Sequence, residues 1–230
     1  MERDRALAEL AARADGVFTL EQARDCGLTP DEIRQRQRGT WIRLYDRVYR
    51  APGAPTTWRG DLRAASLAAE PHGVVSHRAA AAIYGLPGGR KDIIELCCPR
   101  WRRTRAAGLV AHESTLVPPQ DLQLVDDVPV VRPERAAFEL ASIYRSVDFI
   151  ERVLHAARRQ RLITYGSTVA TFTRLAGRGR PGVVVFREAL ERWQPSQRPT
   201  ESERETLLLQ VLRRRQLPEP VLQHEVFDGA

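Results

Sequence analysis

The feature that most constrains the fold is a pair of helix-start signals close together near the N-terminus. Thr19 is followed three residues later by Gln22, and Thr29 is followed at once by a proline and two acidic residues. A threonine cap, a Gln or Glu three residues on and a proline in the first turn are typical of helix starts. Because Gly27 separates the two signals and Gly39 follows the second, neither helix can be long. The sequence therefore predicts short helices over residues 19–27 and 29–38.

Two more elements flank these helices. Apolar residues at helical spacing predict a first helix over residues 5–14, followed by a short extended link at Val17 and Phe18. Residues 41–50 alternate around a short polar break, as in a tight two-stranded ribbon, and Pro52 to Pro55 close the segment. Three short helices and then a hairpin, within about fifty residues, is the order of parts in a winged helix-turn-helix.

Basic residues gather in the third helix and the ribbon. The chain carries a formal net charge of +7, and the segment from Ile33 to Arg50 holds arginines with a single acidic residue, Asp46. Arginine and glutamine side chains bind phosphates and base edges, so this segment suits a nucleic-acid partner. The alternative is a solvated helix face beside a solvated ribbon. The candidate DNA contacts are Arg34, Gln35, Arg36, Gln37 and Arg38 on the helix, with Arg43, Arg47 and Arg50 on the hairpin.

The middle of the chain predicts a mixed domain of helices around a small antiparallel or mixed sheet. Strands are expected over 92–98, 108–112 and, as a pair, within 122–131; helices are expected over 133–144, 147–159, 164–176 and 181–193. His77 lies in the first turn of an alanine-rich helix without a Cys, Asp or second His at ligand or triad spacing, so we expect a structural role. The turn 177–180 is expected to be a linker, because it lacks the spacing of a phosphate-binding loop.

One loop in this region combines charge with an indole ring. Arginines for phosphate and a tryptophan for stacking are the composition of a nucleic-acid contact. The alternative is a solvated hairpin tip with the tryptophan folded onto the sheet. The residues of this secondary candidate contact are Arg100, Trp101, Arg102, Arg103 and Arg105.

Residues 194–199, rich in proline and glutamine, mark the clearest boundary in the chain. A capped helix to about Arg215 and an apparent strand over 221–226 follow, too little to bury a core. The expected class is α+β, with a winged helix-turn-helix over 1–55, a central domain over 56–194 and an incomplete αβ segment over 195–230. No apolar stretch reaches the roughly 18 residues of a spanning helix, and the charged N-terminal segment lacks the apolar core expected of a signal peptide. We expect a cytoplasmic protein with no membrane partner, and the three unpaired cysteines predict neither disulfide nor metal.

The segments 20–27, 41–50 and 75–88, with Ser76-His77-Arg78 and Gly85-Leu86-Pro87-Gly88, resemble the AbiEi antitoxins of type IV toxin–antitoxin systems. The similarity covers roughly residues 5 to 190. It implies a winged helix that binds operator DNA and represses its own operon, and a following domain that counters a nucleotidyltransferase toxin. It places the DNA surface over 29–38 and 43–50, which adds Thr29 to the candidate contacts. A homodimer would pair two such recognition helices on one site.

The tail, from Pro199 to Glu205 and from Leu217 to Pro220, resembles the entry to a very-short-patch-repair-type endonuclease domain. The resemblance implies that Glu205 is a helix acid supporting a magnesium site. The metal-binding strands should follow Val226, and the sequence ends at Ala230. We therefore expect no nuclease activity and no cofactor for the chain as written, with Mg²⁺ required only by a complete nuclease domain.

Three functions follow from these patterns. The first is a sequence-specific DNA-binding repressor that acts as an antitoxin-like autoregulator. The second is a DNA-targeted endonuclease whose catalytic half is missing from this chain. The third is an interaction protein in which residues 57–193 bind a toxin and the N-terminal helices are a structural remnant.

Overall fold

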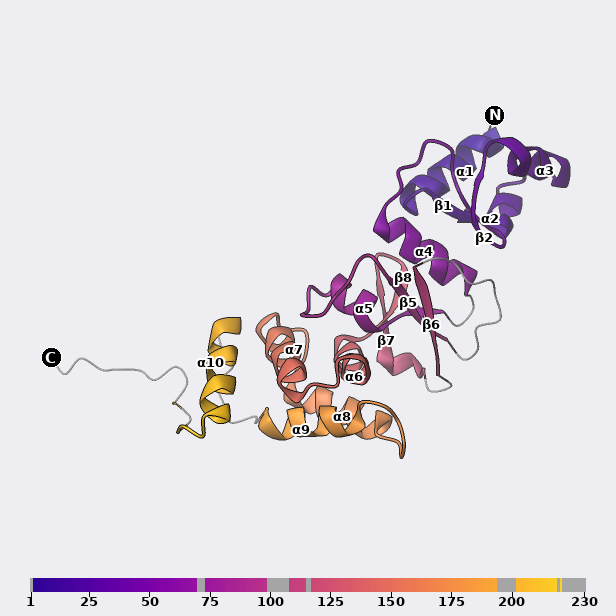
Figure 1. The fold of residues 1–230 in the computed structure, drawn as a ribbon. Coiled ribbons are helices and arrows are strands. Elements are labelled where there is room, and N and C mark those ends of the chain that lie inside the picture. The colour runs from indigo at the N-terminus through magenta and orange to yellow at the C-terminus, as the bar shows by residue number, and fades with distance from the viewer. Residues whose placement is uncertain are drawn as a thin grey trace. The chain divides into compact units, whose positions relative to one another are not determined.

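The computed structural model describes residues 2–69, 73–98, 108–114, 117–193, 202–218 and 220. The chain forms two compact units, the first made of residues 1–79 and 91–130 and the second of residues 80–90 and 131–230. Helices and two small sheets are both present, which confirms the α+β class (Figure 1). The two units are described separately.

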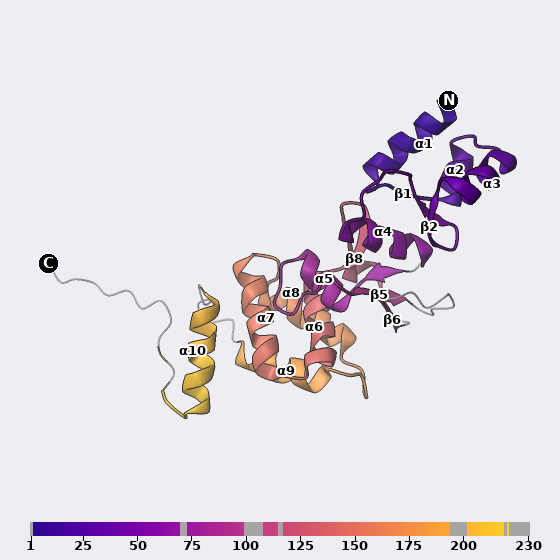
Figure 2. The same ribbon diagram turned by 45° about the horizontal axis from the view of Figure 1, so that its top comes forward.

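The first unit opens with helices and a small antiparallel sheet (Figure 2). Its strands lie in the order β1-β3-β2. The predicted helices and ribbon are confirmed, but the expected link at Val17 and Phe18 is a strand, since Phe18 lies opposite Tyr49 in β3. The elements are α1 (Glu2–Arg13), β1 (Val17–Thr19), α2 (Leu20–Asp25), α3 (Pro30–Gly39), β2 (Ile42–Tyr45) and β3 (Val48–Arg50).

Local signals and aromatic packing together fix these elements. Both predicted caps form reciprocal capping boxes, Thr19 with Gln22 and Thr29 with Glu32. The rings of Phe18 and Trp41 meet edge to face with centroids 4.8 Å apart, and Tyr49 packs against both. Ile33 is the buried residue of α3 and belongs to the same core, so the helix is held by one side only.

Helix α4 (Trp58–Ala68) covers this sheet. Val17 and Val48 pack against Ala64 and Ala68, all of them buried. The same helix also contacts a second sheet of the first unit, whose strand order is β6-β5-β4-β8-β7. These strands are β4 (Val74–Val75), β5 (Ile94–Cys98), β6 (Leu109–Glu113), β7 (Leu122–Val125) and β8 (Val128–Val131), and a short 3-10 helix, η1 (Pro119–Asp121), precedes β7.

The second sheet is mixed, as the sequence allowed. Strand β4 pairs with β5 antiparallel and with β8 parallel, and β5 pairs with β6 parallel. Because β5 and β6 run in the same direction, they do not form a hairpin, and the alternative of a hairpin tip between them was wrong. Adjacent strands suggested a hairpin from sequence, but the direction of pairing depends on the whole sheet.

The second unit is helical. Helix α5 (His77–Ile83) begins in the first unit and ends in the second, which continues with α6 (Pro133–Tyr144), α7 (Val147–Arg159), α8 (Tyr165–Leu175), α9 (Val183–Arg192) and α10 (Glu203–Arg214). Phe138, Ile150, Leu154, Phe186 and Trp193 are buried in its core. Gly182, at the start of α9, has φ +86, and a Cβ there would lie 2.7 Å from the Ser142 nitrogen, so only glycine fits. In the part of the chain described here, no helix is long and apolar enough to cross a membrane.

Candidate nucleic-acid interface

One side of α3 makes contacts within the protein. The Gln37 amide nitrogen donates to the Tyr49 hydroxyl oxygen at 2.7 Å. The Arg36 guanidinium donates to both carboxylate oxygens of Asp4 at 2.9 Å and to the Glu32 carbonyl oxygen at 2.9 Å, and its side chain is 22% exposed. Ile33, Arg36 and Gln37 therefore anchor α3, and Arg36 ties it to α1.

The opposite side of α3 is open. Asp31, Arg34, Gln35 and Arg38 are exposed, and their spacing of three, four and seven residues places them on one stripe of the helix. We call these four residues the outer stripe. Arg34 pairs with Asp31 within the stripe. Arg38 has no ion-pair or hydrogen-bond partner among the residues that the structure describes. The stripe thus presents guanidinium and amide donors with one carboxylate acceptor between them.

Thr29 has a structural task at the start of α3. Its hydroxyl accepts from the Glu32 backbone N–H at 3.3 Å, and the Glu32 carboxylate accepts from the Thr29 backbone N–H at 2.7 Å. Hydrogen bonds from the Thr29 backbone and hydroxyl, in that order, lower the pKa of Glu32, with Arg3 and Arg36 adding to them. The Thr29 hydroxyl and the Glu32 carboxylate both serve the cap.

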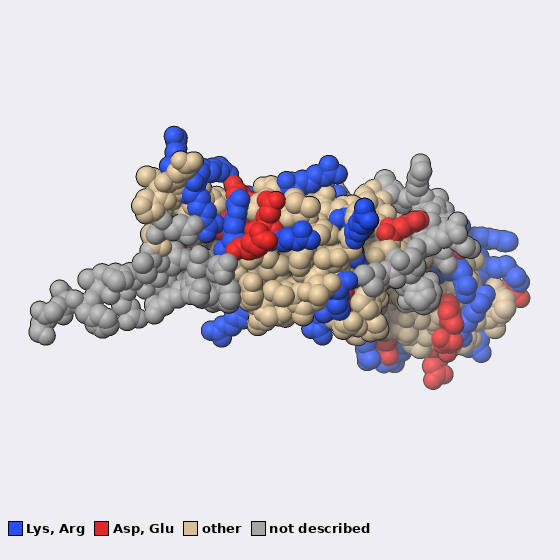
Figure 3. All heavy atoms as spheres, turned by 90° about the horizontal axis from the view of Figure 1, so that it is seen from below, with Lys and Arg blue, Asp and Glu red and all other residues tan. Residues whose placement is uncertain are grey.

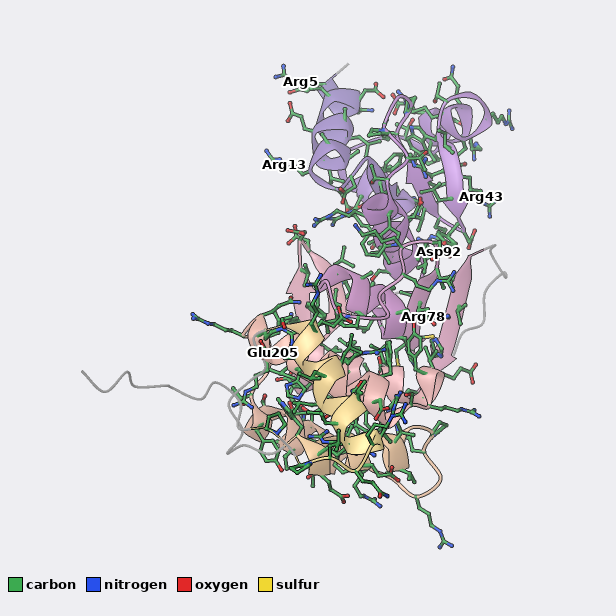
Figure 4. The ribbon with its side chains drawn as sticks, turned by 60° about the vertical axis from the view of Figure 1, so that its left-hand side comes forward. Arg5, Arg13, Arg43, Arg78, Asp92 and Glu205 are labelled. Atoms are coloured by element: carbon green, nitrogen blue, oxygen red, sulfur yellow. The ribbon has the colours of Figure 1, made fainter. Side chains whose placement is uncertain are left out.

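The hairpin exposes two arginines, Arg43 on β2 and Arg47 in the turn. Arg43 donates to the Asp46 carboxylate at 3.0 Å, and its side chain extends outward from the hairpin (Figure 4). Arg47 lies in the turn with φ +60, a left-handed conformation that is uncommon for arginine. It is exposed, and within the described ranges it has no ion-pair partner.

Arg50 lies elsewhere. It is 7% exposed, and its guanidinium contacts the Asp61 carboxylate at 3.1 Å and the Thr56 hydroxyl. The side chain connects β3 to α4 and is enclosed by them. The DNA contact expected at Arg50 from its charge is corrected accordingly, because a guanidinium closed off in this way cannot reach a phosphate.

The candidate interface is therefore narrower than the basic segment suggested. Of the expected contacts, Arg34, Gln35 and Arg38 on α3 and Arg43 and Arg47 on the hairpin are exposed. On the face of the molecule in Figure 3, basic side chains are spread over the surface with acidic side chains between them. The overall charge of the surface therefore does not locate a polyanion-binding site as clearly as the outer stripe does. Asp31 was not among the expected contacts, although its spacing from Arg34 and Arg38 could have revealed it.

The other candidate residues occupy different places. Arg100, Trp101, Arg102, Arg103 and Arg105 lie outside the described residues. Glu205 lies in the first turn of α10, where its backbone N–H donates to the Ser202 hydroxyl at 3.2 Å and its carboxylate accepts from that hydroxyl at 3.4 Å. Across the described ranges, His, Cys, Asp and Glu form no group of three or more that could hold a metal ion.

His77 belongs to a polar cluster beside the second sheet. This position is compatible with the structural role expected of His77. The Glu95 carboxylate is fully buried and accepts from Arg78 and from His112, and the rings of His77 and His112 stack with centroids 3.5 Å apart. The His77 Nδ1 and the Ser76 hydroxyl lie 2.9 Å apart. Sequence reasoning missed Glu95, because its partners lie 17 residues away on either side.

Comparisons with known proteins add little to this geometry. No family model matches the chain, and no curated protein matches it. Among solved structures, the RV2827C protein from Mycobacterium tuberculosis is similar with a TM-score of 0.48 and 15% sequence identity, covering 89% of this chain and 80% of that one.

Proposed function

We propose that this chain binds duplex DNA through α3 and the β2–β3 hairpin, with residues 1–55 as a winged helix-turn-helix. In this proposal α3 is the recognition helix in the major groove, and the hairpin is the wing that contacts the phosphate backbone.

The outer stripe is the observation that carries the proposal. Ile33, Arg36 and Gln37 hold α3 on its inner side, so the helix presents Arg34, Gln35 and Arg38 outward as a fixed set. Arginine and glutamine are the side chains that read guanine and adenine edges. Arg43 and Arg47, which follow α3 in the sequence and are exposed on the hairpin, supply the charge that a wing needs.

The role we propose is repression of the chain's own operon, as in the AbiEi antitoxins that the sequence resembles. A nucleotidyltransferase toxin would then be the protein partner, and a homodimer would bind two half-sites. These roles rest on the resemblance. The DNA-binding surface rests on the arrangement of α3 and the hairpin.

Fluorescence anisotropy of the full chain tests the proposal against two duplexes, its own upstream region and a scrambled sequence, at low and moderate salt. We expect tighter binding to the upstream region that persists at moderate salt. Arg47→Ala should weaken binding to both duplexes several-fold and lower the salt dependence by about one phosphate contact. Arg38→Ala should weaken binding several-fold and reduce the preference for the upstream duplex.

Arg13→Ala is the matched control, since it removes the same charge from an exposed position on α1 (Figure 4). It should leave the affinity within about twofold. Equal losses for Arg13, Arg38 and Arg47 would mean that only overall charge attracts DNA. Binding that is equal for both duplexes and vanishes with salt would reject a sequence-reading repressor.

A further inference from the structure

We infer that the recognition helix selects a G·C base pair, with Arg34 on the guanine and Asp31 as the specificity-determining residue. The inference rests on the proposed DNA-binding function and names the sequence that the same surface would prefer.

Asp31 is the acidic residue of the outer stripe. Glu32 is used by the cap with Thr29, Asp4 by Arg36, and Asp46 by Arg43. Asp31 is 87% exposed, lies on the outer stripe and pairs with Arg34, which is itself 60% exposed. Asp31 is an acid in the first turn of α3, where it favours the helix dipole, and its exposed carboxylate also lies where a DNA base could reach it.

The Arg34–Asp31 pair offers donors and an acceptor side by side. In the major groove a G·C pair presents two acceptors, guanine N7 and O6, and next to them the cytosine N4 donor. A guanidinium can bind N7 and O6 while a neighbouring carboxylate accepts from N4. An A·T pair places a donor between two acceptors, so it cannot satisfy both side chains in the same way.

A carboxylate on this face also opposes other binding modes. Asp31 repels phosphate oxygens and adds no affinity of its own to a backbone-only contact. It therefore weakens binding to any duplex that does not offer a cytosine N4 donor. Selectivity comes from that penalty as much as from the favourable contact.

The experiment selects duplexes from a randomised library with the full-length chain and three variants. Asp31→Asn removes the charge. Arg34→Lys keeps its charge but loses the bidentate fork. Asp25→Asn is the control, because it makes the same charge change at an exposed position on α2, outside the stripe. Circular dichroism checks that each variant remains folded.

We expect the wild type and Asp25→Asn to select one G·C position that Arg34→Lys loses. Asp31→Asn should lower the preference for G·C over A·T at that position at least about fivefold. It should also bind a duplex without a G·C pair at that position more tightly than Asp25→Asn does. If Asp31→Asn retains the full G·C preference, the inference is wrong while DNA binding stands. If the wild-type chain enriches no duplex at low salt, the proposed function fails and this inference with it.

Discussion

Glu95 keeps a negative charge although its side chain is fully buried. Burial alone would raise its pKa, but hydrogen bonds from His112 and from the Arg78 side chain and backbone outweigh that effect and hold the pKa at about 2. The Arg78 donors lie 2.8 to 3.0 Å from the carboxylate oxygens. This carboxylate therefore joins β5 to the start of α5 and to β6.

Removing that charge should destabilise the first unit. A pKa of about 2, against an unfolded value of about 4.3, corresponds to about 3 kcal/mol of stability that is present above the unfolded pKa and lost as the pH falls towards 2. Glu95→Gln should lower the free energy of unfolding at pH 7 by about this amount, because Arg78 loses its counter-charge. Urea unfolding of wild type and variant from pH 7 to pH 2.5 measures it. A difference that does not narrow below pH 4 would contradict this assignment.

The candidate site was only partly predictable at the level of single residues. Charge density located α3 and the hairpin, and helical spacing could have singled out Asp31. Charge density could not separate Arg38, which is exposed, from Arg50, which is enclosed, because the hydrogen bond from Arg50 to Asp61 spans 11 residues of sequence. Arg36 pairs with Asp4 across 32 residues. Such partners depend on the tertiary fold.

At the scale of the element, local sequence determines where α3 starts. Thr29→Ala removes the hydroxyl that caps the helix and should cost about 1 kcal/mol of stability. Thr29→Ser keeps the hydroxyl and the backbone N–H that form the two hydrogen bonds of the cap, so its stability should equal that of the wild type. Chemical denaturation of the three proteins measures the change. A loss of DNA affinity in Thr29→Ser, with stability unchanged, would instead indicate that the Thr29 methyl group contacts DNA.

Elements with local signals were predicted best. Helices α6 and α7 have the predicted bounds, since proline begins one and Ser146 caps the other. Strand β1 was missed because three residues are too short to show alternation, and it is a strand only through its pairing with β3. The parallel pairing of β5 and β6 likewise follows from the whole sheet.

At the scale of the whole molecule, α4 determines how short a stable N-terminal fragment can be. Residues 1–55 include the helices and hairpin of the proposed DNA-binding domain but not α4, which covers Val17 and Val48 and pairs with Arg50 through Asp61. Exposing one such valine costs about 1.5–3 kcal/mol. A fragment of residues 1–69 should therefore unfold cooperatively and at higher urea than a fragment of residues 1–55. Circular dichroism during urea titration compares them, and equal midpoints would show that α4 is dispensable.

The discontinuous first unit also bears on how the protein is made. Strand β4 pairs with β8 through Val75 and Val130, so a ribosome must translate the intervening segment, including residues of the second unit, before this pairing can form. At about 5–20 residues per second the delay is roughly 3–11 s. During that time α1 to α4 can already be assembled at the exit tunnel, whereas β4 has an open edge. The nascent chain would then be exposed to chaperones at β4 rather than at the proposed recognition helix.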